Sequence, residues 1–146
     1  MTLPRLSRLA HRLVSTYVEP VPVKSFSRLI PPRTVGDPRE CYENARKEFW
    51  ARENQDPVYW VGWLTATHKY QWQKEQREEK FKRLHHAWVT VGDAVADATP
   101  FKYGVGNFTD LPVVLAHEGL EDFEYEGLYT VSPDKLEKVL SYFPPR

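Results

Sequence analysis

The chain has 146 residues, of which 41% are hydrophobic and 14% aromatic, and its 20 basic residues balance its 20 acidic residues. This composition excludes an intrinsically disordered chain, and the neutral charge argues against a general nucleic-acid binder. No apolar run reaches the roughly 18 to 20 residues of a membrane span, and the single cysteine, Cys41, excludes an internal disulfide and a cysteine-rich zinc site. We therefore expect a single domain, residues 1–146, without a membrane anchor and in a reducing, cytoplasmic setting.

The charge is balanced overall but unevenly distributed. Residues 1–39 carry seven basic and two acidic residues, whereas residues 100–146 carry four basic and eight acidic residues. This asymmetry predicts that the two ends pack near each other or share a surface, and a charged partner is the alternative.

The first elements are a helix and a proline-rich segment. In residues 1–17, Leu6, Ala10 and Leu13 lie on one helical stripe, and the arginines lie off it. The same acid-free composition is typical of a mitochondrial presequence, but we favour an amphipathic helix docked on the domain. Residues 19–38 contain five prolines and should be extended or looped.

A helix is predicted from about Pro38 to Arg52. Asp37 would be its N-cap, Pro38 its first residue and Glu40 the partner in a capping box. This assignment places Cys41 in the first helical turn.

Strands and surface segments follow this helix. Residues 58–65 are β-branched and aromatic and predict a buried strand, whereas the charged residues 68–83 predict a solvated helix or a surface excursion. Two strands, 86–91 and 94–99, flank a turn at Gly92-Asp93. Three segments complete the prediction: a short helix within 109–116, a solvated acidic loop or acidic-aromatic docking surface at 118–126, and a helix from Ser132-Pro133 to about Tyr142.

Cys41 is the first candidate for chemistry. The unpaired N–H groups and the positive end of a helix dipole favour a thiolate at such a position, which makes a cysteine nucleophilic. The alternative is a small, inert, buried residue, because free cysteine is among the most buried residue types. Position alone favours the inert interpretation.

His86 and Asp97 change that balance. If Gly92-Asp93 is a two-residue turn, Val91 faces Ala94, and Asp97 becomes a diagonal neighbour of His86 on the same face of the hairpin. An aspartate in that position can fix the tautomer of an imidazole and support its positive charge. A histidine and an aspartate placed at random on a hairpin would share a face about half the time, so the pattern permits a dyad without requiring one.

These residues together resemble a known family. The segments CYENA at 41–45, HAW at 86–88 and VADAT at 95–99 are similar to the core of the transglutaminase-like branch of the papain-like superfamily. The resemblance covers roughly residues 37–100, with Ala98 where that family usually has proline.

The resemblance implies an acyl-transfer chemistry. Cys41 would attack an amide or ester carbonyl, His86 would act as general base and then acid, and Asp97 would orient His86. The acyl group would pass to water, as in a peptidase or amidase, or to an amine. Arg33-Thr34 and the Cys41 backbone N–H are the candidates for binding the oxyanion.

The remaining residues add no second site. Trp88 and Trp63 are the candidate substrate-binding side chains, although we favour a core position for both. His85 and His86 are adjacent on a strand and face opposite ways, and the other histidines lack a ligand spacing, so no metal and no cofactor is expected.

The predicted fold is therefore α+β, a small antiparallel sheet packed against the Cys41 helix with helices at both termini. The first functional hypothesis is cysteine-dependent acyl transfer or hydrolysis of a peptide or protein amide by Cys41, His86 and Asp97. The alternative is a non-catalytic module or inhibitor that binds a protein partner, for example a phage-encoded one acting in the host cytoplasm.

Overall fold

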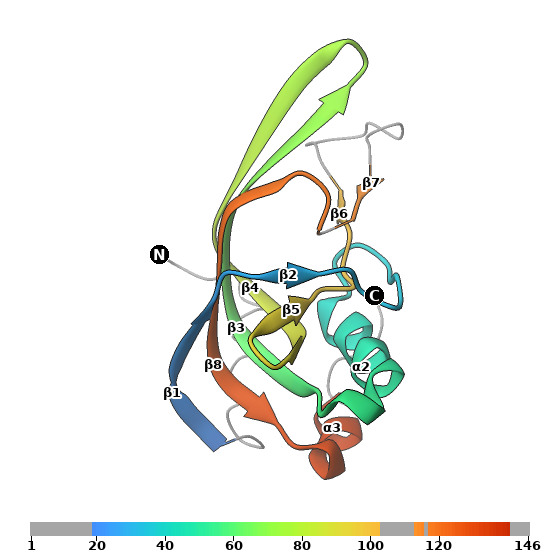
Figure 1. Ribbon diagram of the computed structural model, residues 1–146, viewed down its shortest axis with the longest axis vertical. Coiled ribbons are helices and arrows are strands. Elements are labelled where there is room, and N and C mark those ends of the chain that lie inside the picture. Colours follow the sequence, from blue (N-terminus) through green and yellow to red (C-terminus); the bar gives the residue numbers. More distant parts are fainter. Residues whose placement is uncertain (1–18, 103–112, 116, 141–146) are drawn as a thin grey trace.

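The fold is built around one curved sheet. In the computed structural model, which describes residues 19–102, 113–115 and 117–140, six strands form a sheet in the order β1-β8-β3-β4-β5-β2 (Figure 1). Every neighbouring pair is antiparallel except β2 and β5. The strands are β1 (Glu19–Phe26), β2 (Leu29–Ile30), β3 (Val58–Trp72), β4 (Glu75–Val91), β5 (Ala94–Ala96) and β8 (Leu120–Val131).

Helices cover only part of this sheet. The described chain contains α2 (Cys41–Ala51), the 3-10 turn η1 (Glu53–Gln55) and α3 (Pro133–Leu140). The start of α3 agrees with the predicted helix at Ser132-Pro133. The N-terminal helix expected in residues 1–17 lies outside the described residues, so the α+β class is confirmed but not helices at both termini. Among the helices of the described segments, none is long and apolar enough to cross a membrane.

The prediction for the start of α2 was wrong. The N-cap is Glu40 rather than Asp37, no side chain caps the helix, and Arg39 has a φ of 68°. The reason is that Asn44 binds the Asp37 backbone, because its Nδ2 donates to the Asp37 carbonyl over 2.7 Å and its Oδ1 accepts from the Asp37 N–H over 3.2 Å. Residues 37–40 therefore form a turn that precedes the helix, and Cys41 becomes the first helical residue.

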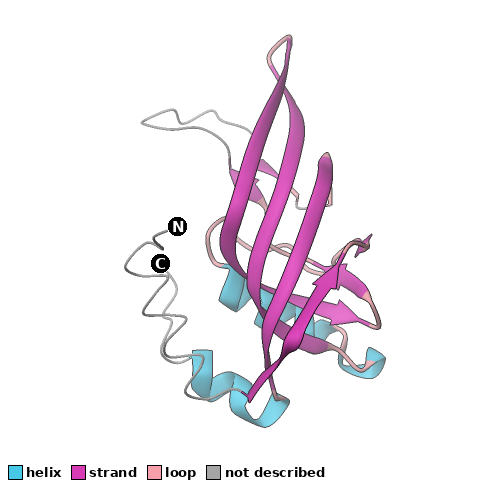
Figure 2. Ribbon diagram, turned by 90° about the vertical axis from the view of Figure 1, so that its left-hand side faces the viewer, coloured by secondary structure: helices cyan, strands magenta, loops and turns pink. Residues whose placement is uncertain are grey.

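The expected helix or excursion at residues 68–83 is instead the outer part of a long β-hairpin. β3 and β4 pair continuously from Val58↔Thr90 to Trp72↔Glu75, apart from a bulge after Leu64. Figure 2 shows the two strands extending beyond the helices, which gather at the opposite end. We call residues 66–83 the β3–β4 arm. Burial alternates along β3 in this arm, where His68 and Tyr70 are buried and Lys69 and Gln71 are exposed.

Two further expectations were also wrong. The acidic residues 118–126 are not mainly a solvated loop, since residues from Leu120 onwards belong to β8 and pair with β1 and β3. Val113–Val114 form β7, which pairs with β6 (Phe101–Lys102), where a helix over 109–116 was expected. Of the remaining residues in that segment, Leu115 is described, whereas residues 109–112 and 116 lie outside the described part. The pairing of β1 with β8 brings part of residues 1–39 beside part of residues 100–146.

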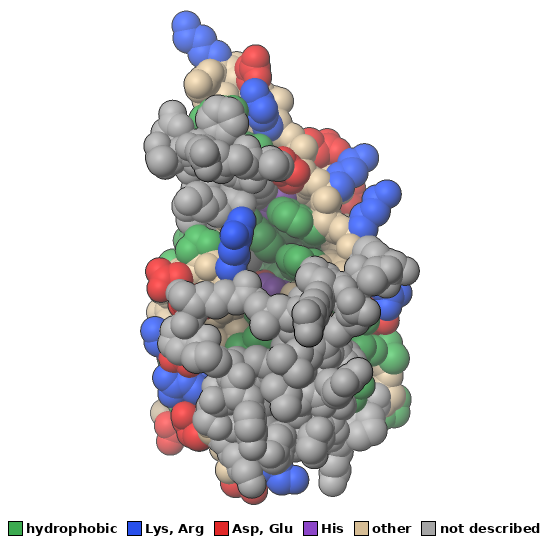
Figure 3. Space-filling view, turned by 180° about the vertical axis from the view of Figure 1, so that it is seen from behind, with side chains coloured by type: hydrophobic (Ala, Val, Ile, Leu, Met, Phe, Trp, Pro, Cys, Tyr) green, Lys and Arg blue, Asp and Glu red, His purple; other side chains and the backbone are tan. Residues whose placement is uncertain are grey.

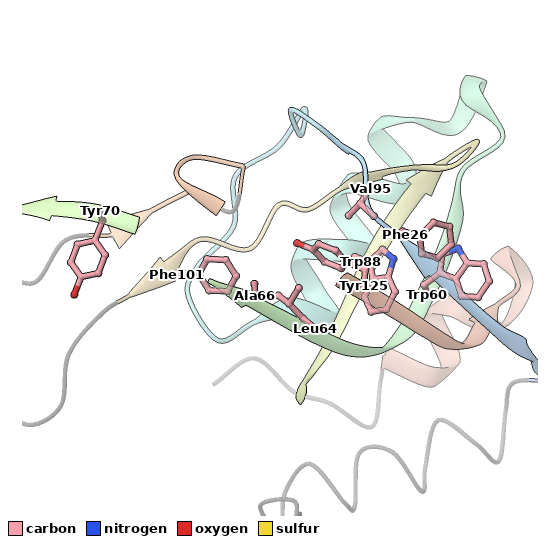
Figure 4. Close-up of a cluster of buried hydrophobic side chains, with 9 residues drawn as sticks. All are labelled: Phe26, Trp60, Leu64, Ala66, Tyr70, Trp88, Val95, Phe101 and Tyr125. Atoms are coloured by element: carbon pink, nitrogen blue, oxygen red, sulfur yellow. The ribbon is translucent and has the colours of Figure 1, made fainter. Parts of the chain in front are cut away.

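Apolar side chains pack on both sides of the sheet. The first cluster joins α2 and α3 to the sheet and is formed by Ala45, Phe49, Tyr59, Val61, Ala87, Val89, Val131 and Leu136. The second cluster lies on the face that carries Trp60, Trp88 and Tyr125, with Phe26 against both tryptophan rings (Figure 4). Burial of such rings is a main source of stability for a domain of this size. The second cluster also contacts His86 through Trp88 and Asp97 through Tyr125.

Candidate active site

Cys41 is partly exposed at the first position of α2. The N–H groups of a first helical turn have no partner within the helix, and no side chain caps this end of α2. The positive end of the helix dipole therefore acts on the thiol without competition from a capping carboxylate. This is the environment that the sequence predicted, reached through a different cap residue.

His86 lies on β4, and its partner follows β5. The hairpin has the predicted register, with Val91 opposite Ala94 and Val89 opposite Ala96, and Gly92 supplies the positive φ that its tight turn needs. β5 ends at Ala96, and the next residue, Asp97, accepts a hydrogen bond from His86 Nε2 over 2.7 Å. The structure thus brings together the imidazole and the carboxylate that the hairpin register placed on one face.

The Asp97 carboxylate is buried, with 3% of the residue exposed, and it accepts three hydrogen bonds. His86 Nε2 and the Tyr125 hydroxyl both donate to Oδ2, the latter over 2.6 Å, and the Thr99 backbone N–H donates to Oδ1 over 3.0 Å. Three donors on two oxygens leave the carboxylate little freedom to rotate. Asp97 is therefore held in one orientation, with Oδ2 toward His86.

The same segment is tied to the start of α2. Asn44 Nδ2 donates to Thr99 Oγ1 over 3.1 Å, and the Gly36 N–H donates to the Ala98 carbonyl over 2.9 Å. Gly36 has no room for a side chain, since an added Cβ would lie 1.7 Å from Asn44 Oδ1. These contacts fix the end of the helix that carries Cys41 against the segment that carries Asp97.

His86 joins Cys41 to Asp97. Only 2% of His86 is exposed, and burial by itself would lower its pKa. The charge of Asp97, its hydrogen bond, and a side-chain hydrogen bond and charge interaction with Cys41 outweigh burial and raise the pKa of His86 to about 10. Since Nε2 binds Asp97, Nδ1 is the ring nitrogen left for the thiol. With a pKa of about 10, the His86 imidazole is protonated at neutral pH.

Cys41 also affects the pKa of two neighbouring tyrosines. Burial and then the charge of Cys41 raise the pKa of Tyr42 and of Tyr59 well above the usual value. The Tyr59 hydroxyl donates to the Tyr42 carbonyl over 2.8 Å, which fixes the first turn of α2 against β3.

The candidate substrate-binding tryptophans lie in different surroundings. Trp88 is fully buried beneath the site, and its ring stacks on His86 at 6.3 Å and 19°. Trp63 is nearly buried on the other face, where its ring contacts His85 and the Arg83 guanidinium lies 5.1 Å from its centroid. His85 also forms a hydrogen bond through Nε2 with the Tyr42 hydroxyl, so the adjacent histidines do face opposite ways. Both tryptophans occupy positions that suit the core.

The Arg33-Thr34 candidate for the oxyanion site was wrong. The backbone N–H groups of Arg33 and Thr34 donate to the buried Glu48 carboxylate at distances of 2.8 to 3.0 Å. Glu48 also binds the Thr34 hydroxyl and forms an ion pair with Arg52. These donors serve to hold the 31–34 segment on α2.

No family model, curated protein or solved structure matches the chain. The chemistry of the site must therefore be argued from its own residues. The described residues contain no group of three or more His, Cys, Asp or Glu side chains that could hold a metal ion.

Sequence reasoning missed Tyr125, Thr99 and Glu48. Tyr125 belongs to the acidic segment that was assigned to a loop, and period-2 alternation within residues 120–126 was the signal that could have placed it on a strand. Thr99 was noted only as part of a motif. Glu48 follows Asn44 at helical spacing, and both point into the protein.

Proposed function

We propose that this protein is a cysteine-dependent enzyme that hydrolyses an amide or transfers its acyl group, with Cys41 as nucleophile. The observation that carries the proposal is the position of His86, which contacts Asp97 through Nε2 and whose pKa is raised both by Asp97 and by Cys41. A nucleophile, a base and an orienting carboxylate in this order are the parts of a catalytic triad. The order along the chain and the strand–turn–strand context support a core like that of transglutaminase-like and papain-like enzymes.

The proposed reaction proceeds in two halves. The Cys41 thiolate forms a bond to the carbonyl carbon, and the carbonyl electron pair moves to the oxygen, which the free N–H groups at the start of α2 stabilise. His86 then gives its proton to the leaving amine as the C–N bond breaks, which leaves a thioester on Cys41. In the second half, neutral His86 takes a proton from water or from an acceptor amine, which attacks the thioester and releases the thiolate.

The substrate class follows from the chemistry rather than from a pocket. A peptide or protein amide is the substrate we propose, because an amide needs both a strong nucleophile and a proton for its leaving group. No cofactor takes part in these steps.

A protein-binding module is the second candidate, and the β3–β4 arm favours it. The arm carries many exposed charged side chains, and Figure 3 shows Lys, Arg, Asp and Glu side chains along this upper part of the molecule. Within the arm, Arg77 lies 4.6 Å from the centroid of the Trp72 ring. Charged side chains that complement those of a partner increase the specificity and the rate of association.

Thiol reactivity separates the two functions. We expect iodoacetamide at pH 6 to alkylate Cys41 much faster than free cysteine, because a neighbouring imidazolium increases the reactivity of a cysteine. The substitution His86→Ala should remove the advantage, whereas His117→Ala, in the turn before β8, should leave it unchanged. Circular dichroism would verify that each variant is folded.

A peptide carrying an electrophilic vinyl sulfone provides a second measurement. Mass spectrometry should find this probe on Cys41 in the unmodified chain and not in the folded His86→Ala variant. Slow labelling that does not depend on His86 would reject the enzyme and favour the protein-binding module.

A further inference from the structure

The Asp97 carboxylate has a second partner that the triad alone does not explain. The Tyr125 hydroxyl donates to Oδ2, which is the same oxygen that accepts the hydrogen bond from His86. Tyr125 is fully buried on β8, and Asp97 directly follows β5, with β3 and β4 lying between these two strands in the sheet order. A hydroxyl placed this way contacts neither Cys41 nor solvent, so its effect on the site must pass through Asp97.

The surroundings of Tyr125 fix the direction of this hydrogen bond. Burial and then the charge and hydrogen bond of Asp97 raise the pKa of Tyr125 well above its usual value, so the phenol keeps its proton and always donates. Its ring packs against Trp88 at 5.2 Å and against Phe123 at 6.0 Å. The donor is therefore held in place by contacts that do not depend on the protonation of His86.

A donor of this kind fixes the orientation of the carboxylate. Oδ2 accepts from Tyr125 and His86 while Oδ1 accepts from Thr99. Without the Tyr125 hydroxyl, Oδ2 would keep only the His86 donor, and the carboxylate could turn away from the imidazole whose pKa it raises.

We propose that Tyr125 is a positioning residue, whose hydroxyl keeps the Asp97 carboxylate turned toward His86 and thereby affects how the reactivity of Cys41 depends on pH. This proposal rests on the proposed function, because it assigns Tyr125 a role in preparing the same nucleophile.

The experiment measures the rate of Cys41 alkylation by iodoacetamide from pH 3.5 to pH 8 in the full chain. The substitution Tyr125→Phe removes only the hydroxyl, and we expect the acid limb of the profile to move up by about one pH unit. The matched control is Tyr59→Phe, which also removes a buried hydroxyl next to the site but one that donates to the Tyr42 carbonyl. It should leave the acid limb in place.

A second variant distinguishes a positioning role of Tyr125 from a purely structural one. Site-specific 3-fluorotyrosine at position 125 keeps the hydroxyl and nearly the same volume, and it makes the phenol a stronger donor. The acid limb should then move to lower pH, opposite to the shift in Tyr125→Phe. A purely structural role would lower the rate at every pH and would not reverse its sign between the two variants.

The outcomes are distinct. A fast Cys41 thiol whose acid limb does not move in either Tyr125 variant overturns the role of Tyr125 and leaves the proposed function standing. An equal shift in Tyr59→Phe also overturns it. A thiol in the unmodified chain that is no faster than free cysteine at any pH overturns the proposed function and the role of Tyr125 together.

Discussion

Replacing Asp97 with asparagine tests the electrostatics of the site directly. Asn has nearly the same volume as Asp, and its carbonyl oxygen can still accept a hydrogen bond from the Thr99 N–H. The variant removes the negative charge that His86 contacts at 2.7 Å. Burial then becomes the main influence on the imidazole, and burial lowers the pKa of His86.

The size of the effect follows from the pKa of His86. This pKa is raised from 6.5 to about 10 in the folded chain. Its loss corresponds to roughly 5 kcal/mol, since each pKa unit is worth about 1.4 kcal/mol. Breaking a buried ion pair typically costs about 3–5 kcal/mol, so the two arguments agree in order of magnitude.

The pH dependence has a definite sign. Because folding raises the pKa of His86, its stabilising contribution is complete below pH 6.5 and disappears as the pH rises from 6.5 through about 10. We therefore expect the free-energy difference between the unmodified chain and Asp97→Asn to be largest near pH 6 and to shrink toward pH 10.5. Urea denaturation at several pH values measures this difference.

NMR of the imidazole ring nitrogens measures the pKa itself. His86 should titrate near pH 10 in the unmodified chain and below pH 6.5 in Asp97→Asn. The control is Asp93→Asn on the same hairpin, where the side chain is 78% exposed and pairs only with the exposed Arg28. A His86 pKa near 6.5 in the unmodified chain, or one near 10 in Asp97→Asn, would refute the reasoning.

Three other substitutions test the scaffold, each by urea denaturation. Glu48→Gln should cost about 3 kcal/mol or more because it leaves buried Arg52 without its charge partner, and a loss below 1 kcal/mol would contradict this. Gly62→Ala should lower the free energy of unfolding by about 1–3 kcal/mol, since an added Cβ would lie 1.9 Å from the Glu126 carbonyl oxygen and push β8 away from β3. An unchanged urea midpoint would show that the two strands can separate without loss of stability. Burial lowers the pKa of His68 to about 4, so stability should fall as the pH drops from 6.5 toward 4, and His68→Leu should remove that fall.

The hairpin that holds His86 and Asp97 could be predicted because its determinants are local. A two-residue turn at Gly92-Asp93 fixes the register of both strands, and the register decides which side chains share a face. The start of α3 was predictable for a similar reason, since Ser132-Pro133 acts within one turn.

Features set by distant contacts were not predictable. The sequence at 37–40 has the form of a capping box, but Asn44 occupies the Asp37 backbone and moves the helix start. The β3–β4 arm shows no clear alternation of apolar and polar residues in its sequence, because most of β4 and every second residue of β3 are exposed there and are charged or polar. Tyr125 reaches Asp97 through the order of the strands in the sheet, which no short motif records.

The four side chains of the proposed site come from α2, β4, the segment after β5, and β8. β8 is the last strand of the described chain, and it joins the sheet by pairing with β1 and β3. During synthesis, a growing polypeptide that ends before β8 holds the sulfur, the ring and the carboxylate without the strand that completes their surroundings. We expect the proposed nucleophile to be incompletely prepared in such nascent chains, so that chemical competence arrives only once β8 has joined the sheet.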